Sequence, residues 1–158
     1  MKRVFYLFFI LAFIFLGCEK IELFKEGNIK KEPLDFKPRE VKCVECAMEV
    51  ESKKDSAQAV LPNGRTYFFD DIGCLALWLK KQKDKDKIKL WVYTYDTKRY
   101  IDAKKAWYRL GEKTPMNYGF GAYEKMVNGA ISFDKFLIKM YRGENFKNPA
   151  IRKKFLGE

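Results

Sequence analysis

Hydrophobic and polar positions alternate in short stretches near the middle of the chain. Residues 57–61 and 65–69 are rich in apolar and aromatic side chains, and the residues between them, 62–64, read Pro-Asn-Gly. Turn-forming residues between two such stretches predict a β-hairpin. A third stretch, 88–95, carries β-branched and aromatic residues and predicts another strand.

The segment between the hairpin and the third strand has a helical period instead. Ile72, Leu75 and Leu79 recur at i, i+3 and i+7, which places them on one face of a helix. Asp70 or Asp71 can begin this helix by accepting hydrogen bonds from its first backbone N–H groups. Capping accounts for this carboxylate pair, so no acid–base catalysis is predicted from it. Hairpin, helix and third strand together predict a ββαβ unit.

The second half of the chain has a similar order of elements. Residues 106–111 and 119–123 predict two strands, and residues 131–141 predict a helix that begins after Ser132. The apolar side chains of this helix fall on one face: Phe133, Phe136, Leu137 and Met140.

The pattern therefore predicts an α+β protein built from two small ββαβ lobes. The first lobe spans 43–98, and the second spans 99–158 and ends in a basic tail. The two halves share this pattern without convincing sequence identity, so the repeat is one of element order only.

The N-terminus has the pattern of an export signal. Lys2 and Arg3 precede an uncharged apolar run that is shorter than the roughly 20 residues a membrane-spanning helix needs. The following FLGC resembles a bacterial lipobox, which predicts a cleaved signal peptide at 1–17 and a lipid on Cys18. The alternative is an uncleaved anchor helix, and either interpretation places the domain outside the cytoplasm on a membrane. Residues 18–42 are polar and contain prolines, which predicts a linker after the anchor.

The composition excludes several classes of site and partner but does not by itself identify a function. The formal charge is +11, and removal of the signal peptide lowers it to +9. Lysines alternate with acidic residues in the segment 80–89, which is typical of a solvated surface. The chain has no histidine, which excludes a Ser-His-Asp triad, a Cys2His2 zinc site and a His2Cys copper site. Export and the lack of a recognition motif argue against a nucleic-acid partner.

Three cysteines remain if Cys18 carries a lipid: Cys43, Cys46 and Cys74. An odd number cannot all pair within one chain. In an oxidising compartment, a bound soft metal would keep these thiols from pairing. The alternative is a Cys43–Cys46 disulfide with Cys74 buried as a small apolar residue.

The segment CVECAM, residues 43–48, concentrates soft ligands. A thiolate and a thioether two residues apart, Cys46 and Met48, would share one face of an extended segment and reach one Cu(I) ion. Zinc would require Cys74 and a carboxylate in addition, because it usually takes four ligands. Met116, in the loop TPMNYGFGAY, is either a further soft ligand or core filler.

Three segments in this order, CVECAMEV, FFDDIGC and TPMNYGFGAY, resemble the NosL family of lipoprotein copper chaperones. The family's Cys-x-Met element falls on Cys46 and Met48, and its Thr-Pro-Met loop ends at Met116. The resemblance implies two ββαβ units, a bound Cu(I), and delivery to a membrane ABC-type complex that matures nitrous-oxide reductase. The chain departs from the family at Ala47 and Asn117, where glycine is usual.

The hypothesis that follows is a Cu(I) chaperone, not an enzyme. Cys46 and Met48 would be the primary ligands, Met116 would close the site, and Cys43 would be a third ligand or a gate. The alternatives are a chaperone for a different extracytoplasmic cuproenzyme, a CxxC thiol–disulfide oxidoreductase, and a structural lipoprotein whose sulfur residues lie in the core.

Overall fold

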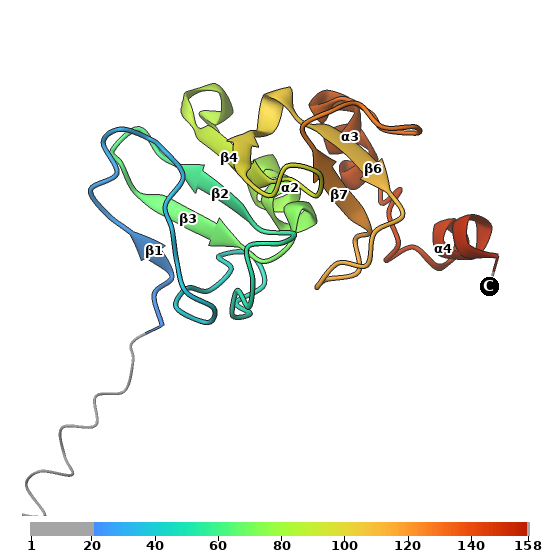
Figure 1. Ribbon diagram of the computed structural model, residues 1–158, viewed down its shortest axis with the longest axis horizontal. Coiled ribbons are helices and arrows are strands. Elements are labelled where there is room, and N and C mark those ends of the chain that lie inside the picture. The colour runs from blue at the N-terminus through green and yellow to red at the C-terminus, as the bar shows by residue number, and fades with distance from the viewer. Residues whose placement is uncertain (1–20, 158) are drawn as a thin grey trace, which may run out of the picture.

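The computed structural model describes residues 21–157, which form an α+β fold with two small antiparallel sheets (Figure 1). The first sheet has five strands in the order β1-β3-β2-β4-β5, and the second pairs β6 with β7. The strands are β1 Phe24–Lys25, β2 Ala57–Val60, β3 Thr66–Phe69, β4 Lys89–Tyr93, β5 Tyr100–Asp102, β6 Trp107–Leu110 and β7 Phe120–Tyr123. The helices are α2 Ile72–Lys80, α3 Phe133–Tyr141 and α4 Pro149–Leu156, with short 3-10 turns η2 Lys85–Lys87 and η3 Ala103–Lys105. The predicted α+β class is confirmed.

The predicted hairpin and first helix lie where the pattern placed them. Strands β2 and β3 pair antiparallel, with Ala57 opposite Phe69 and Val60 opposite Thr66. Helix α2 begins after Asp71, whose carboxylate accepts a hydrogen bond from the Gly73 N–H at 2.8 Å. The helix packs on the sheet through a nearly continuous run of buried side chains. The chain therefore passes directly from a central strand of the sheet into a buried helix start.

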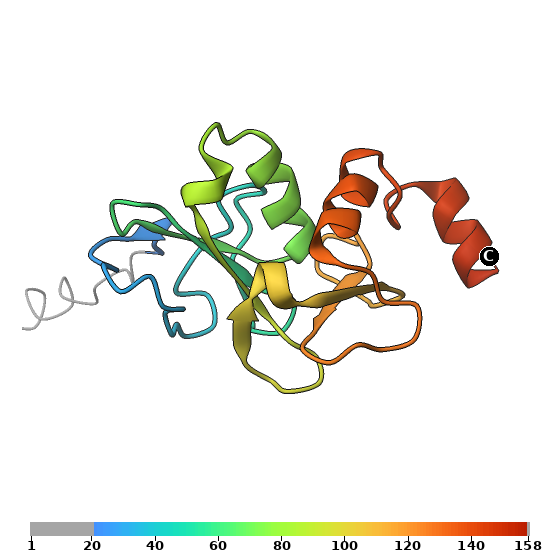
Figure 2. The same cartoon turned by 90° about the horizontal axis from the view of Figure 1, so that it is seen from above.

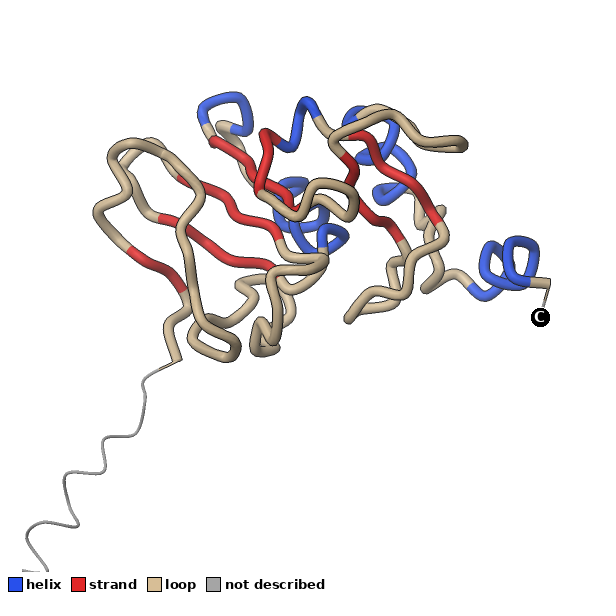
Figure 3. The backbone as a smooth tube through the Cα atoms, in the orientation of Figure 1, coloured by secondary structure: helices blue, strands red, loops and turns tan. Residues whose placement is uncertain are grey.

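One hydrophobic core runs through both sheets. It joins side chains of α2 and the first sheet to Tyr108 and Phe120 of the second sheet and to Phe136 of α3. The Tyr108 and Phe136 rings stack with centroids 4.3 Å apart. A parallel bridge from Thr94 to Ala122 links the sheets at the backbone level. Figures 2 and 3 show α2 and α3 lying side by side, and these helices also make mutual contacts.

The second half differs from the predicted ββαβ unit. It runs β6, β7, α3, and within the described chain no strand follows α3; helix α4 takes that position. Strand β5 pairs with β4, so the segment just after residue 98 completes the first sheet. Ser132 occupies the position before α3, but its side chain makes no capping hydrogen bond.

The predicted linker is folded over the part that the structure describes, residues 21–42. Strand β1 pairs with β3 and forms one edge of the first sheet. Phe36 and Val41 are buried and form a second small cluster with Val50 and Phe68. Prolines and charges obscured these apolar anchors in the sequence. Because the anchors hold the segment on the sheet, it does not act as a flexible spacer.

The basic C-terminus is helical. Helix α4 is capped by Asn148, which accepts a hydrogen bond from the Ala150 N–H at 3.0 Å. The Phe155 ring contacts Phe146 at a centroid distance of 5.2 Å, which ties the helix to the segment after α3. Across residues 21–157, none of the helices has the length and apolar character needed to cross a bilayer.

Candidate metal centre

The CVECAM segment forms a tight turn that is closed at its base. The Cys43 N–H donates to the Met48 carbonyl at 2.8 Å, and the Ala47 N–H donates to the Cys43 carbonyl at 2.9 Å. Ala47 has a φ of 63°, a left-handed conformation that glycine adopts without steric cost. The turn is fixed to the first sheet by a hydrogen bond from the Val44 N–H to the Phe68 carbonyl. The segment is therefore a turn, and the extended conformation expected around Cys46 and Met48 is wrong; their binding of one ion stays a prediction.

The turn brings its two cysteines to the junction between β3 and α2. Asp70 directly follows β3, and Cys74 is the third residue of α2. The ligand atoms of Cys43, Cys46, Asp70 and Cys74 all lie within 4.8 Å of one another. Three of these residues are buried, and only Cys46 is partly exposed. All three cysteines are free thiols, so the chain presents a Cys3Asp ligand set that could hold a metal ion.

Asp70 is positioned to complete such a site. Its Oδ1 accepts a hydrogen bond from the Cys46 thiol at 3.3 Å. Its Oδ2 is buried and has no hydrogen-bond partner, although the residue is only 4% exposed. A buried carboxylate oxygen normally has a partner, because leaving it unpaired is costly. A cation bound among the thiols would supply that partner.

The three thiols differ in acidity. A hydrogen bond from the Cys74 thiol lowers the pKa of Cys43, and the same hydrogen bond raises the pKa of Cys74. Burial raises the pKa of Cys46 to about 12. Cys43 is therefore the first of the three to become a thiolate, and Cys74 stabilises it as a neutral donor. The thiolate is the form that binds metals, so Cys43 is the thiol of this cluster most ready to act as a ligand.

The Thr-Pro-Met loop is attached to the same helix start. Asp71 accepts a hydrogen bond from the Met116 N–H at 3.1 Å through the carboxylate oxygen that does not cap α2. The Thr114 hydroxyl in turn accepts a hydrogen bond from the Gly119 N–H at 3.1 Å. Burial raises the pKa of Asp71 to about 6, against the effect of these hydrogen bonds. Asn117, in the same loop, has a φ of 57° and so adopts a left-handed conformation like Ala47.

Both methionines lie at the edge of this region. Met48 is 53% exposed and lines a cavity of about 740 Å³ together with Asp70 and Pro115. Met116 is half-buried and packs against the main core, while its backbone is held by Asp71. The structure thus brings the CVECAM turn and the Thr-Pro-Met loop to one helix start, where Met48 and Pro115 line the same cavity. The roles of Met48 and Met116 as ligands stay predictions.

Two members of the ligand set were not assigned from the sequence. Cys74 was left between ligand and core, and Asp70 was explained by helix capping. Asp71 alone makes the cap, so Asp70 is free to face the thiols. The spacing of four between Asp70 and Cys74, around a helix start, is the signal that could have paired them. Cys18, the predicted lipid site, lies outside the described residues.

Comparison with known proteins adds no relative. No protein-family model matches the sequence, and no curated protein matches it. The metal-binding interpretation therefore depends on the geometry of the Cys3Asp cluster.

Proposed function

We propose that this protein is a Cu(I) chaperone that binds its metal through the thiolates of Cys43 and Cys46, with Cys74 beside them as a third ligand or a neutral donor. The observation that carries the proposal is the convergence of three free thiols within 4.8 Å of one another. Cu(I) is a soft ion, and two or three sulfur ligands suffice to hold it. The metal is cargo in this account, and no catalytic step is assigned to the chain.

The unequal acidity of the thiols supports a low-coordinate ion. Cys43 supplies the first thiolate, and Cys46 becomes the second when the metal displaces its proton. Cys74, whose pKa is strongly raised, joins as a third ligand or remains a neutral donor to Cys43. A monovalent ion held by two thiolates leaves less uncompensated charge in this buried pocket than one held by three thiolates and a carboxylate.

Partial exposure on one side suits a carrier. Cys46 and Met48 lie at the surface, whereas Cys43 and Cys74 are buried. A partner sulfur can therefore approach the ion from the Met48 side before Cys46 leaves. The resemblance to the NosL family supports, as recipient, a membrane ABC-type complex that matures nitrous-oxide reductase, with the chaperone lipid-anchored outside the cytoplasm. A different extracytoplasmic cuproenzyme would fit the same site chemistry.

A structural zinc site is the second candidate, and the Cys3Asp set favours it specifically. Zinc usually takes four ligands in a tetrahedral arrangement, and cysteine and aspartate are among its common ligands. In that case Asp70 would be an obligatory ligand, and the ion would contribute to folding stability rather than be passed on.

Competition titration separates these two candidates. The full-length chain, reduced, is titrated with Cu(I) against a chromophoric Cu(I) chelator, and separately with Zn(II) against a zinc chelator. We expect Cys43→Ser to weaken Cu(I) binding at least 100-fold, about 2.7 kcal/mol. Met126→Leu, which alters an exposed methionine outside the cluster, is the control and should leave the affinity unchanged. Unchanged Cu(I) affinity in Cys43→Ser would overturn the proposal, and tighter retention of zinc than of copper in the presence of both would favour the second candidate.

A further inference from the structure

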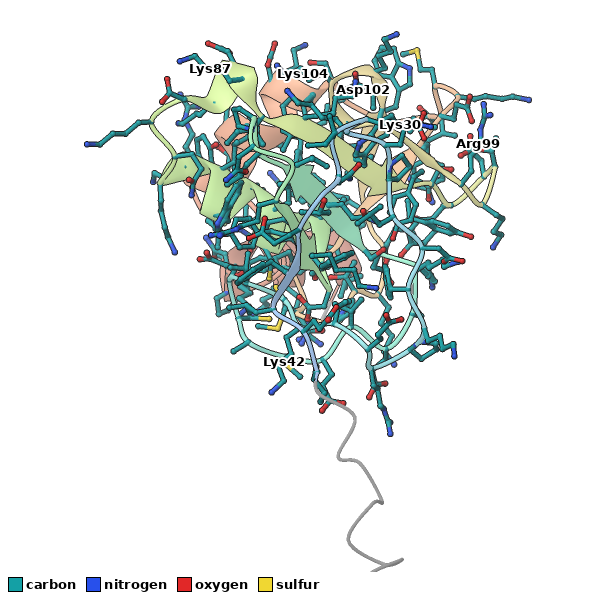
Figure 4. The ribbon with its side chains drawn as sticks, turned by 90° about the vertical axis from the view of Figure 1, so that its left-hand side faces the viewer. Lys30, Lys42, Lys87, Arg99, Asp102 and Lys104 are labelled. Carbon is teal, nitrogen blue, oxygen red and sulfur yellow. The ribbon has the colours of Figure 1, made fainter. Side chains whose placement is uncertain are left out.

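The first described residues of the chain are bonded to the strand that leads into the metal turn. The Glu22 N–H donates to the Glu40 carbonyl at 2.9 Å, and the Lys42 N–H donates to the Glu22 carbonyl at 2.9 Å. Glu22 also forms a parallel bridge with Val41. Lys42 immediately precedes Cys43, so the point at which the chain enters the fold adjoins the metal turn. Figure 4 shows Lys42 at this end of the molecule and Lys87 and Lys104 at the opposite end.

The predicted lipid site is too near this entry point to allow free movement of the domain. Three residues lie between Cys18 and Glu22, and the four Cα-to-Cα steps from one to the other span at most about 14 Å when fully extended. Paired strands lie about 5 Å apart, so the backbone at Lys42 adds little to this distance. The metal turn therefore lies within about 20 Å of the lipid-bearing residue. The folded segment 21–42 supplies no slack, since β1 and the Phe36 cluster fix it to the domain.

We propose that the lipid on Cys18 holds the metal face, defined as Glu22 and residues 42–49, against the bilayer surface. The consequence of this orientation rests on the proposed function. Copper would be exchanged with a partner embedded in the membrane, and not with a freely diffusing protein that approaches the opposite end of the domain. The tether enters at the metal face, so any short anchor there orients that face toward the lipid.

The surface of this face carries charges of both signs: Glu22, Glu45 and Glu49 lie on it with Lys42, and Glu45 and Glu49 are paired with Lys81 and Arg39. Leu23, which follows Glu22, and Met48 in the metal turn are exposed apolar side chains, 44% and 53% exposed. The Lys42 ammonium forms no ion pair with any residue in the described range 21–157, so it is available to a headgroup phosphate. The opposite end, at η2 and η3, carries Lys87 and Lys104 and would face away from the membrane.

Paramagnetic relaxation tests this orientation without new cysteines. The full-length lipidated chain is placed in phosphatidylcholine–phosphatidylglycerol nanodiscs that contain a lipid with a gadolinium-chelating headgroup. Amide relaxation enhancement falls with the sixth power of distance. We therefore expect it to be at least about fivefold larger for residues 42–49 than for Lys87 and Lys104, since the anchor holds the turn within about 20 Å. Relaxation that is equal at the two ends, or larger at Lys104, would overturn the proposal, as would an intact mass without lipid on Cys18.

A spacer variant provides the matched control. Insertion of twenty Gly/Ser residues between Lys20 and Ile21 leaves every contact of the described fold in place and frees the domain to turn. The difference in relaxation between the two ends should then fall by at least about half, because a flexible chain of this length spans about 25 Å. Its Cu(I) affinity should be unchanged. Loss of copper binding in the parent chain would refute the proposed function alone, whereas a relaxation difference that survives the insertion would refute only the orientation.

Discussion

Replacing Asp70 by asparagine tests how the carboxylate contributes to the metal centre. The change preserves shape and keeps one oxygen to accept the Cys46 thiol hydrogen bond, but it removes a buried carboxylate oxygen that has no partner. A buried unpaired charge costs more than a buried neutral amide, so the metal-free protein should gain about 1–2 kcal/mol in free energy of unfolding. For a chain of this size, that gain corresponds to a rise in Tm of about 4 °C.

The neighbouring aspartate provides the control, and the expected sign is opposite. Asp71 accepts hydrogen bonds from the Gly73 and Met116 N–H groups through its two oxygens, and asparagine can satisfy only one of them. Asp71→Asn should therefore lower the free energy of unfolding by about 1–3 kcal/mol. Both variants are measured by urea unfolding of the metal-free, reduced chain. The reasoning is refuted if Asp70→Asn destabilises the protein as much as Asp71→Asn does.

The same Asp70 variant discriminates between metals. If sulfur alone holds Cu(I), Asp70→Asn should change the Cu(I) affinity by less than about threefold, or 0.7 kcal/mol. Zinc would lose one of its four ligands, so its affinity should fall at least about tenfold, or 1.4 kcal/mol. An equal loss for both ions would contradict a sulfur-only copper site.

Three further predictions follow from the backbone and from a buried carboxylate away from the metal centre. Ala47→Gly should stabilise the protein by about 0.5–1 kcal/mol in thermal unfolding, since it relieves a left-handed alanine; a loss of stability would count against the turn geometry. Gly73→Ala should destabilise it by at least about 2 kcal/mol, because the added methyl would lie 2.3 Å from the Tyr118 ring; chemical denaturation measures this, and no change would be inconsistent with that packing. Burial raises the pKa of Asp55 above its ordinary 3.8. Its contribution to stability is therefore full below pH 3.8 and declines as the pH rises through the folded-state pKa. Asp55→Asn should flatten this decline in unfolding curves taken across that range, and an unaltered pH profile would refute it.

Local signals in the sequence account for the elements that were predicted correctly. The hairpin at β2 and β3 and the start of α2 are each specified by residues a few positions apart, namely a turn, an alternating pattern and a cap. The packing of residues 21–42 could not be predicted from such local signals. It depends on β1 pairing with β3 some forty residues later, and on a few apolar anchors among prolines and charges. Strand β5 could not be predicted for the same reason, because its three residues form a strand only by pairing with β4.

The candidate site, too, was predictable from the sequence only in part. The sequence places soft ligands in CVECAM and in the Thr-Pro-Met loop, and the fold brings both segments to the start of α2. The geometry of the turn depends on Ala47 adopting a conformation that alanine rarely takes, so an extended segment was the natural expectation. Asp70 and Asp71 look equivalent in the sequence. Only the direction of each side chain separates the one that caps the helix from the one that faces the thiols.

X-ray absorption at the copper edge of the Cu(I)-loaded, full-length chain tests whether sulfur holds the ion. We expect a first shell of two or three sulfur atoms, and the loss of one of them in Cys43→Ser. A first shell made of oxygen or nitrogen, or a spectrum that Cys43→Ser leaves unaltered, would contradict it.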